Sequence, residues 1–438
     1  MSGLEIGIWS LVAILVLIQL GLHVGFTLIA VSIVGVIALK GNVTIAGVFL
    51  SMAALSSIAS YSYAVIPLFV LMGLLVNVSG LGKDMFAVSR QLFRSAPGGM
   101  GIATIFANAI FAAVNGTSIA SASVFTRIAV PEMLATGFSR KFSVGLVAGS
   151  SVLGMLIPPS LLLILFGIVT ESSIGALFAA GIIPGLLLAL IFTLLALGLT
   201  HFAPGFVWAD GRPGIEDAPA LMSAGQLFAK SAPVLILVVV VLGGIYGGVF
   251  SPTEAGGVGA AAALLIAVLR RSLTFRSFMT LLIETGRVTA SITFLLVGAH
   301  MYARLLAMTG LPAQFGGLLN GWDLGIVGVL LIYVAMVIVL GAILDSASII
   351  LILIPLFLPI ISAQQVDIVW FGILTIVTVE IGLLTPPLGI ACFVVKANLQ
   401  SHDIRLGEVF AGAFPFVLAM MVLVALLMLF PGLTHAPF

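Results

Sequence analysis

Charged residues are scarce in this sequence. Only 7% of its 438 residues are Asp, Glu, Lys or Arg, and 62% are hydrophobic, whereas about a quarter of a typical soluble domain is charged. A water-soluble fold of this size could not hide so much apolar surface. The formal net charge of +1 gives no indication of nucleic acid or of an acidic partner. The composition therefore predicts a polytopic protein embedded in a lipid bilayer.

Cysteine and clustered histidine are also lacking. The single cysteine, Cys392, excludes a disulfide framework and a thiolate metal cluster. The five histidines are scattered, without the H-E-x-x-H spacing of a zinc protease. The sequence contains neither a G-x-x-x-x-G-K-[ST] phosphate loop nor a G-x-S-x-G nucleophile elbow. These absences favour a transport protein that does not itself hydrolyse ATP over an enzyme.

Long apolar runs that contain glycine and proline fill most of the chain. A spanning helix needs about 20 such residues, and an outer-membrane barrel would instead show alternation in segments of about 10 residues, so we expect an all-α fold. The first run lacks a positive leader and a cleavage site, which favours a retained signal anchor. The expected organisation is scaffold helices in 1–60, a first repeat in 61–200, a polar connector in 201–229, further scaffold helices in 230–308, a second repeat in 309–400 and a C-terminal helix in 401–438.

The two halves share spaced residues. Ser118, Pro131, Gly154 and Pro158-Pro159 are each matched 228 positions later, by Ser346, Pro359, Gly382 and Pro386-Pro387, since 346 − 118 = 228 and 386 − 158 = 228. A constant offset that holds on prolines and a glycine indicates an internal duplication, as in many secondary transporters.

Charge predicts opposite directions for the two repeats. A charged connector with Lys83, Arg90 and Arg94 precedes 100–135, and Arg140 and Lys141 follow it, whereas the loops at 309–323 and 363–367 carry no Lys or Arg. By the positive-inside rule, the first repeat opens from the cytoplasm and the second from the opposite side. We therefore expect inverted repeats, with both termini periplasmic.

Each repeat contains an apolar stretch divided by small polar residues. The halves of 100–135 and 324–362 have roughly 14–18 residues, too short to cross a hydrocarbon core of about 30 Å comfortably. We interpret both stretches as re-entrant helical hairpins, with tips at Asn115-Gly116-Thr117-Ser118 and Asp345-Ser346-Ala347-Ser348. The alternative is two full spans joined by a tight turn.

A Pro-Pro pair then interrupts the apolar run after each hairpin, within 142–169 and 367–396. Proline has no N–H, so two prolines together free backbone carbonyls, which must be buried or coordinate something at membrane depth. Carbonyls, hydroxyls and a carboxylate form an oxygen shell suited to Na⁺. A purely structural kink is the alternative.

Two carboxylates stand in apolar surroundings. Asp345 would cost about 2.5–3.5 kcal/mol on insertion scales if placed in hydrocarbon, so it is a candidate cation ligand or proton shuttle. The alternative is a structural ion pair with Arg304 or Arg287. Glu380 fits a structural role and an ion relay equally well.

Arg127, in the first hairpin, is a candidate contact for an anionic substrate. It could equally snorkel to the membrane surface or pair with Glu132.

Five motifs together resemble the large membrane subunit of tripartite ATP-independent periplasmic (TRAP) transporters. They are NGTSIASASVFTRIAVPEM (115–133), GSSVLGMLIPPSLLLILFG (149–167), FAAGIIPG (178–185), FSPTEAGGVGA (250–260) and GLLTPPLGIACF (382–393). The resemblance implies an elevator-type, Na⁺-coupled importer in the bacterial inner membrane. It also implies a small four-helix membrane subunit, expected here as a separate polypeptide, and a periplasmic substrate-binding protein that delivers an organic acid.

The resemblance places the Na⁺ sites where each hairpin tip meets its broken helix. The implied ligands are Asn115, Gly116, Thr117, Ser118 and Pro158 in one copy, and Asp345, Ser346, Ser348, Thr385 and Pro386 in the other. Candidate substrate contacts are Arg127, Ser121 and Gly389. Many relatives have a more Ser/Ala-rich first tip, and we would expect a small or apolar residue at the position of Arg127. A stand-alone Na⁺/carboxylate carrier is the second hypothesis, and an intramembrane enzyme or passive complex subunit is the third.

Overall fold

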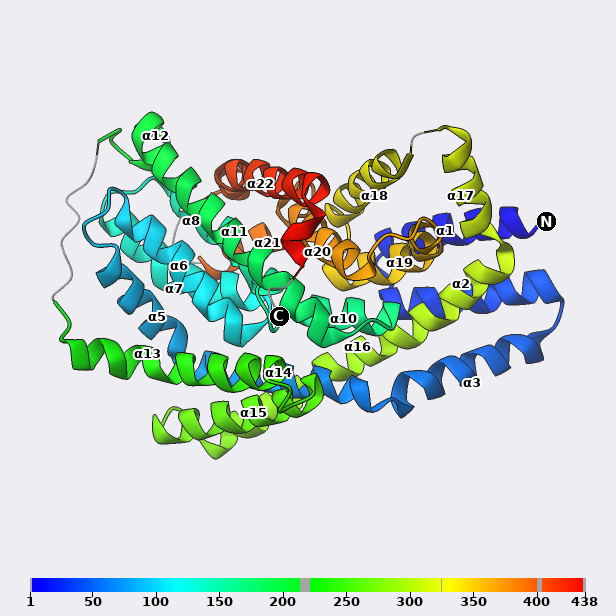
Figure 1. The fold of residues 1–438 in the computed structure, drawn as a ribbon, viewed down its shortest axis with the longest axis horizontal. Coiled ribbons are helices and arrows are strands. Elements are labelled where there is room, and N and C mark those ends of the chain that lie inside the picture. The colour runs from blue at the N-terminus through cyan, green and yellow to red at the C-terminus, as the bar shows by residue number, and fades with distance from the viewer. Residues whose placement is uncertain (1, 213–220, 324, 400–403, 436–438) are drawn as a thin grey trace.

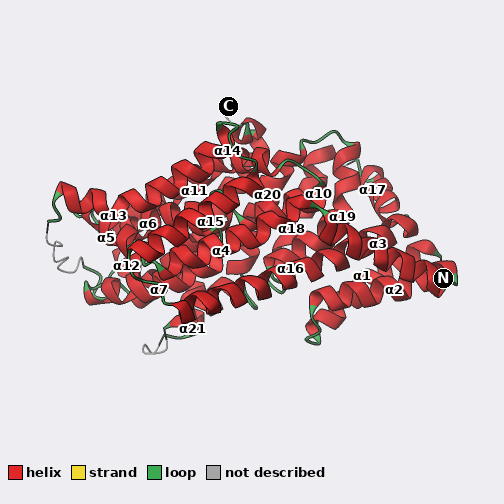
Figure 2. Ribbon diagram, turned by 90° about the horizontal axis from the view of Figure 1, so that it is seen from below, coloured by secondary structure: helices red, strands yellow, loops and turns green. Residues whose placement is uncertain are grey.

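The fold is entirely helical in the part of the chain that the computed structural model describes, residues 2–212, 221–323, 325–399 and 404–435. Figure 2 shows helices joined by loops. Within these ranges the only β-type pairing is one isolated bridge between Phe138 and Trp208. The all-α prediction is confirmed. Seven of the described helices, or eight counting one bent pair, are long and apolar enough to cross a membrane.

The first half of the chain contains an N-terminal set of helices, a helix pair and a broken helix. Its elements are α1 (Gly3–Gln19), α2 (Val24–Lys40), α3 (Val43–Ala59), η1 (Tyr61–Ala64), α4 (Val65–Val78), α5 (Leu81–Leu92), α6 (Gly99–Asn115), α7 (Ser118–Ala135), α8 (Arg140–Ser151), α9 (Leu153–Leu156), α10 (Leu161–Thr170), α11 (Ile174–Phe202) and α12 (Pro204–Val207).

The second half follows the same order. Its elements are α13 (Ala224–Val238), η2 (Val239–Gly243), α14 (Gly244–Tyr246), α15 (Pro252–Leu269), α16 (Phe275–Thr309), α17 (Leu311–Gly321), α18 (Gly325–Gly341), α19 (Ser346–Ala363), α20 (Ile368–Leu384), α21 (Ile390–Asn398), α22 (Leu406–Leu429) and η3 (Pro431–Thr434).

Long helices border the molecule and the hairpins pack behind them. The 35-residue α16 packs along α2, α3 and α4, and α15 packs on α4, so that α3, α13, α15 and α16 follow one border in Figure 1. The hairpins and broken helices lie on the inner side of this border. Every residue of α20 from Trp370 to Leu384 is buried, which makes this helix the centre of the fold.

Element bounds repeat at the offset found in the sequence. The helices α6 and α18 both have 17 residues, and α7 and α19 both have 18. The second helix of the first hairpin begins at Ser118, and the second helix of the other hairpin begins at Ser346. The two broken helices begin at Arg140 and Ile368. Both pairs of starting residues are therefore 228 positions apart. Thr117 and Asp345, which share it too, are the N-caps of α7 and α19. The paired spacing in the sequence therefore corresponds to paired helices.

Two segments expected to be loops are helices. The charged connector after residue 79 contains α5, and the loop at 309–323 contains α17. In α5 the apolar residues Leu81, Met85 and Phe86 are buried at helical spacing, while Lys83 is exposed and Asp84 and Arg90 are half-buried. The charged residues of this segment mask its helical periodicity in the sequence.

Helices occupy both ends of the segment 201–229, which the sequence predicts to be a polar connector. Helix α11 continues to Phe202 and α13 begins at Ala224; residues 213–220 lie outside the described part.

Candidate functional site

The first hairpin tip rests directly on the first break. Gly116 ends α6 in the left-handed region, with φ of 69°, which glycine adopts without strain. A Cβ there would lie 2.7 Å from the carbonyl oxygen of Pro159. The Leu161 amide, just after the prolines, donates to the Gly116 carbonyl at 3.1 Å. Tip and break are therefore joined through their backbones.

A second glycine permits the same contact from the other side. A Cβ on Gly154 would lie 2.7 Å from the Thr117 carbonyl oxygen and 3.1 Å from the Ser118 nitrogen. Because Pro158 has no N–H, the Gly154 carbonyl lacks its usual helical donor. All residues from 151 to 160 are buried, and the helices on either side of the break differ in direction by 42°.

A small cavity lies at this junction. Its volume is about 20 Å³, and a cavity needs at least about 10–15 Å³ to hold one water-sized particle. The Asn115 amide nitrogen donates to the carbonyl and the hydroxyl of Thr117, at 3.0 and 3.2 Å, which leaves the amide oxygen of Asn115 out of these bonds. The walls are formed by Phe69, Val70, Met72, Asn115, Gly116, Thr117, Pro159 and Leu161. The space fits a single small cation or water.

The second tip meets the second break in a related way. The Leu388 amide donates to the Ala342 carbonyl at 3.0 Å, and a Cβ on Gly382 would lie 2.5 Å from the Cα of Gly341. Thr385 caps α20 and donates its hydroxyl to Ile381 at 2.7 Å. Pro386 is exposed, so this junction is more open than the first.

Asp345 caps α19. Its carboxylate accepts from the Ser348 backbone N–H at 3.2 Å and from the Ser348 hydroxyl. The sequence places it among apolar neighbours, but these are buried or half-buried in the core whereas Asp345 itself is exposed. Within the described ranges no ion pair joins it to an arginine, and Arg304 donates to the Phe49 carbonyl instead. The charge of Asp345 therefore stays available at the open tip.

The candidate substrate residues lie apart from one another. Arg127 is exposed and donates to the Asn398 side chain at 2.8 Å, on the wall of a cavity of about 560 Å³. Glu132 pairs with Arg90 at 2.5 Å, not with Arg127. Ser121 is fully buried, and Gly389 is the N-cap residue of α21. In the described structure no hydrogen bond connects the three candidates.

Two polar pairs that join a hairpin to a broken helix were missed from the sequence. Asn108 of α6 donates to Ser150 of α8, and Tyr333 of α18 bonds to Thr375 of α20, both at 2.8 Å. The partners are 42 residues apart in each pair. The two pairs are offset by 333 − 108 = 225 residues, three short of the 228-residue offset, so they do not occupy matching positions of the repeats. Polar residues 42 positions apart in apolar runs were the signal that could have revealed them.

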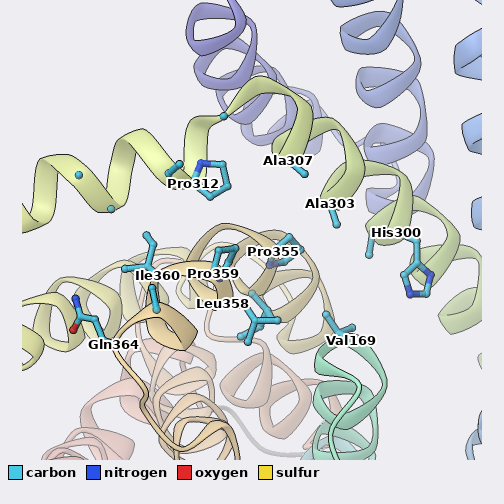
Figure 3. A pocket seen from close by; sticks show the side chains of 17 residues that line it. Val169, His300, Ala303, Ala307, Pro312, Pro355, Leu358, Pro359, Ile360 and Gln364 are labelled. Atoms are coloured by element: carbon cyan, nitrogen blue, oxygen red, sulfur yellow. The ribbon is translucent and has the colours of Figure 1, made fainter.

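Another cavity, of about 780 Å³, contains none of the tip residues. It separates α16 and α17 from α19, with Ala303 and Pro312 facing Pro355 and Pro359 across it (Figure 3). His300, on the same wall, bonds to Ser57 at 2.9 Å. The apolar walls offer few groups that could hold an ion.

Residues 11–433 match the family described as "Tripartite ATP-independent periplasmic transporter, DctM component". The C4-dicarboxylate TRAP transporter large permease protein DctM of Pseudomonas aeruginosa is 30% identical, with 86% of each chain covered. The sialic acid TRAP transporter large permease protein SiaM of Vibrio cholerae is 30% identical, with 94% of each chain covered. The 2,3-diketo-L-gulonate TRAP transporter large permease protein YiaN of Escherichia coli is 29% identical, covering 86% of this chain and 87% of that protein.

Two solved transporters share the fold. The Alcanivorax borkumensis YdaH transporter superimposes with a TM-score of 0.60 at 14% identity, covering 89% of both chains. MtrF of Neisseria gonorrhoeae gives a TM-score of 0.58 at 11% identity, covering 87% of this chain and 84% of that one. At these identities the likeness concerns the fold alone. The family match and the similarity to the large permeases decide the assignment: this chain belongs to the DctM component family of tripartite ATP-independent periplasmic transporters, and it is a multi-pass membrane transport protein rather than an enzyme.

Proposed function

We propose that this chain imports a small organic acid across the bacterial inner membrane and couples that import to Na⁺ entry. The solutes in the names of its relatives, C4-dicarboxylates, sialic acid and 2,3-diketo-L-gulonate, are organic acids. An inward Na⁺ gradient can drive such anions against the negative potential of the cell interior when more positive than negative charge enters.

The small cavity at the first tip is the observation that carries the Na⁺ proposal. It offers oxygen atoms from Asn115, Thr117 and the broken backbone in a space for one ion, and oxygen ligands suit hard cations. The second tip supplies the exposed Asp345 carboxylate, which accepts from the buried hydroxyl of Ser348. Na⁺ at both junctions would stabilise the loaded state, and coupling follows if Na⁺ affinity differs between the two transport states.

Clustered charges support a cytoplasmic location for one end of the molecule. Asp84 of α5 contacts Lys230 of α13 at 2.9 Å and Arg270 of α15 at 2.5 Å. These contacts bring basic side chains of α13 and α15 to one place on α5, and the positive-inside rule expects such basic residues on the cytoplasmic side. We infer inverted repeats, periplasmic termini and an elevator motion of hairpins and broken helices against the long border helices.

The other two components are proposed as a small four-helix membrane subunit and a periplasmic substrate-binding protein. The family description names a tripartite system, so the chain acts with partners. Exposed apolar side chains on α1, α2 and α3, including Trp9, Phe26 and Leu55, form a face that lipid or the membrane subunit would cover.

Uptake into vesicles tests the proposal. The chain is reconstituted with its two partner components, and uptake of labelled organic acids is measured with an inward Na⁺ gradient or with K⁺ in its place. We expect uptake only with Na⁺ and only with the binding protein present. Equal uptake in K⁺ would refute the Na⁺ coupling, and uptake without the binding protein would favour a stand-alone carrier.

A matched pair of variants then locates the coupling. Asn115→Ala removes the amide at the first cavity, and we expect it to raise the Na⁺ concentration for half-maximal uptake at least several-fold. Asn42→Ala removes an exposed asparagine that caps α3 by bonding to Thr44, at a cost in stability of about 1 kcal/mol, and should leave the Na⁺ dependence unchanged.

A further inference from the structure

A cavity with three basic side chains lies between α5 and α7. Its volume is about 560 Å³, within the range of about 300–1,000 Å³ that is common for small-molecule sites. Lys83 and Arg90 line it from α5, and Arg127 and Glu132 line it from α7. Three basic groups and one carboxylate give the described lining a formal charge of 3 − 1 = +2. A cavity with this excess of positive charge attracts anions.

The carboxylate of Glu132 is already engaged. It pairs with Arg90 at 2.5 Å and so joins α7 to α5. Lys83 is exposed, and its ammonium group has no partner among the described residues. Arg127, also exposed, forms no ion pair in the same part of the chain. An anion in the cavity therefore meets two cations whose charge is not neutralised.

Asn398 of α21 holds Arg127 in place. The amide oxygen of Asn398 accepts from the Arg127 Nε at 2.8 Å and from the Ser123 hydroxyl at 3.0 Å, and its amide nitrogen donates to the Val394 carbonyl at 2.8 Å. Both terminal nitrogens of the Arg127 guanidinium are left without a partner in the described structure. Because these donors lie in one rigid plane, they can bond two oxygens of a single phosphate or carboxylate.

Bonds to α5 fix another part of the cavity wall. Met222, which lines the cavity, is held through its backbone by Gln91: the Gln91 amide nitrogen donates to the Met222 carbonyl at 3.1 Å, and the Met222 N–H donates to the Gln91 amide oxygen at 2.8 Å. Asp84, the neighbour of Lys83, is engaged by Lys230 and Arg270. That cluster has two cations for one carboxylate, so it does not offset the charge of the cavity.

The position of the cavity and its apolar lining fit a phosphate group at the membrane surface. Helix α5 lies at the opposite end of the molecule from the N terminus (Figures 1 and 2), the end that we infer to be cytoplasmic. Beside the charged groups, the cavity is lined by Phe86, Ile128 and Met222. Basic pockets between helices on the cytoplasmic side bind the headgroups of acidic phospholipids.

We propose that this cavity binds a phosphate group, either that of an acidic phospholipid headgroup or that of a soluble phosphate ester. Arg127 bonds the phosphate oxygens through its terminal nitrogens, and Lys83 supplies the second positive charge. A bound phosphate adds bonds between α5 and the first hairpin. The apolar lining favours the lipid as its source. Only the cytoplasmic location rests on the proposed function, and neither Na⁺ coupling nor the identity of the transported acid enters the proposal.

Native mass spectrometry of the purified complex tests the site without any transport assay. The complex is stripped of lipid and titrated separately with phosphatidylglycerol, phosphatidylcholine and glycerol phosphate. We expect tighter binding of phosphatidylglycerol than of phosphatidylcholine, whose headgroup has no net charge. Binding of the acidic lipid alone assigns the site to the membrane, and equally tight binding of glycerol phosphate assigns it to a soluble phosphate ester.

Four variants locate the binding. Lys83→Gln and Arg127→Gln should each weaken it about fivefold, the contribution of one cation near a membrane surface. Glu132→Gln removes the carboxylate from the described lining and should strengthen binding, a gain that misfolding could not produce. Arg276→Gln is the matched control, because Arg276 is an exposed arginine in the first turn of α16, outside the cavity.

The proposal is overturned if Lys83→Gln and Arg127→Gln bind phosphatidylglycerol and glycerol phosphate as tightly as Arg276→Gln does. Equal binding of phosphatidylcholine and phosphatidylglycerol would overturn it too, since charge would then not select the ligand. Because uptake is not measured, a failure of Na⁺-driven import would leave this result standing.

Discussion

The contact between the first tip and the first break can be tested with a single methyl group. Gly154→Ala places a Cβ 2.7 Å from the Thr117 carbonyl oxygen and 2.9 Å from its carbon. These are backbone atoms, so the methyl group cannot be accommodated by rotation of a side chain. Tip and break must move apart, and overpacking of this kind costs about 1–3 kcal/mol.

The strain acts on the state in which tip and break enclose the cavity. If that state binds Na⁺, a loss of about 1–3 kcal/mol corresponds to roughly 5- to 150-fold weaker Na⁺ binding. The assay is a Na⁺ titration of uptake in vesicles, together with a Na⁺ titration of the thermal unfolding midpoint of the purified complex. Both should shift to higher Na⁺ concentration in the same variant.

Gly198→Ala is the matched control. Gly198 lies inside α11, and a Cβ there would meet no atom within 4 Å. In a helix interior this change favours folding by about 0.5–1 kcal/mol, and Na⁺ affinity should not change. If Gly154→Ala showed the same Na⁺ affinity as Gly198→Ala, the junction would not be a Na⁺ site and the reasoning would be wrong.

Three further predictions concern other parts of the structure. Asp345→Asn keeps a good N-cap for α19 but removes the charge, so thermal stability should stay near wild type while Na⁺-dependent uptake is lost; unchanged Na⁺ dependence would remove this carboxylate from the mechanism. Asp84→Asn weakens the bonds to Lys230 and Arg270, and a charged hydrogen bond contributes about 1.5–3 kcal/mol, so thermal unfolding should occur at lower temperature; an unchanged midpoint would mean that the cluster contributes nothing to stability. Tyr333→Phe removes a buried hydrogen bond to α20, and denaturant unfolding should show a loss of about 1 kcal/mol; a gain would contradict that bond's role.

The paired hairpins and breaks could be predicted because their signals are local. Proline pairs and small polar residues within apolar runs constrain the backbone wherever they occur. Pro158 and Pro386 therefore mark the same features in sequence and structure. The helix α5 was missed because its charges hid a helical period that Leu81, Met85 and Phe86 display.

Contacts between the repeats could not be predicted. The bond between Arg127 and Asn398 depends on how α21 packs against α7, and the two residues are 271 positions apart. The exposure of Asp345 likewise follows from the packing of α19, whose Ile349 and Ile350 are buried while the carboxylate at its start is not. Periodicity describes one helix at a time and carries no information on these distances.

Simultaneous measurement of radioactive Na⁺ and labelled organic acid entering the same vesicles tests most directly whether the two junctions couple ion entry to solute entry. With the full tripartite system we predict that both labels enter together in a fixed ratio, and that Asn115→Ala lowers both in parallel at limiting Na⁺. Solute entry at the wild-type rate with no accompanying Na⁺ would contradict the account.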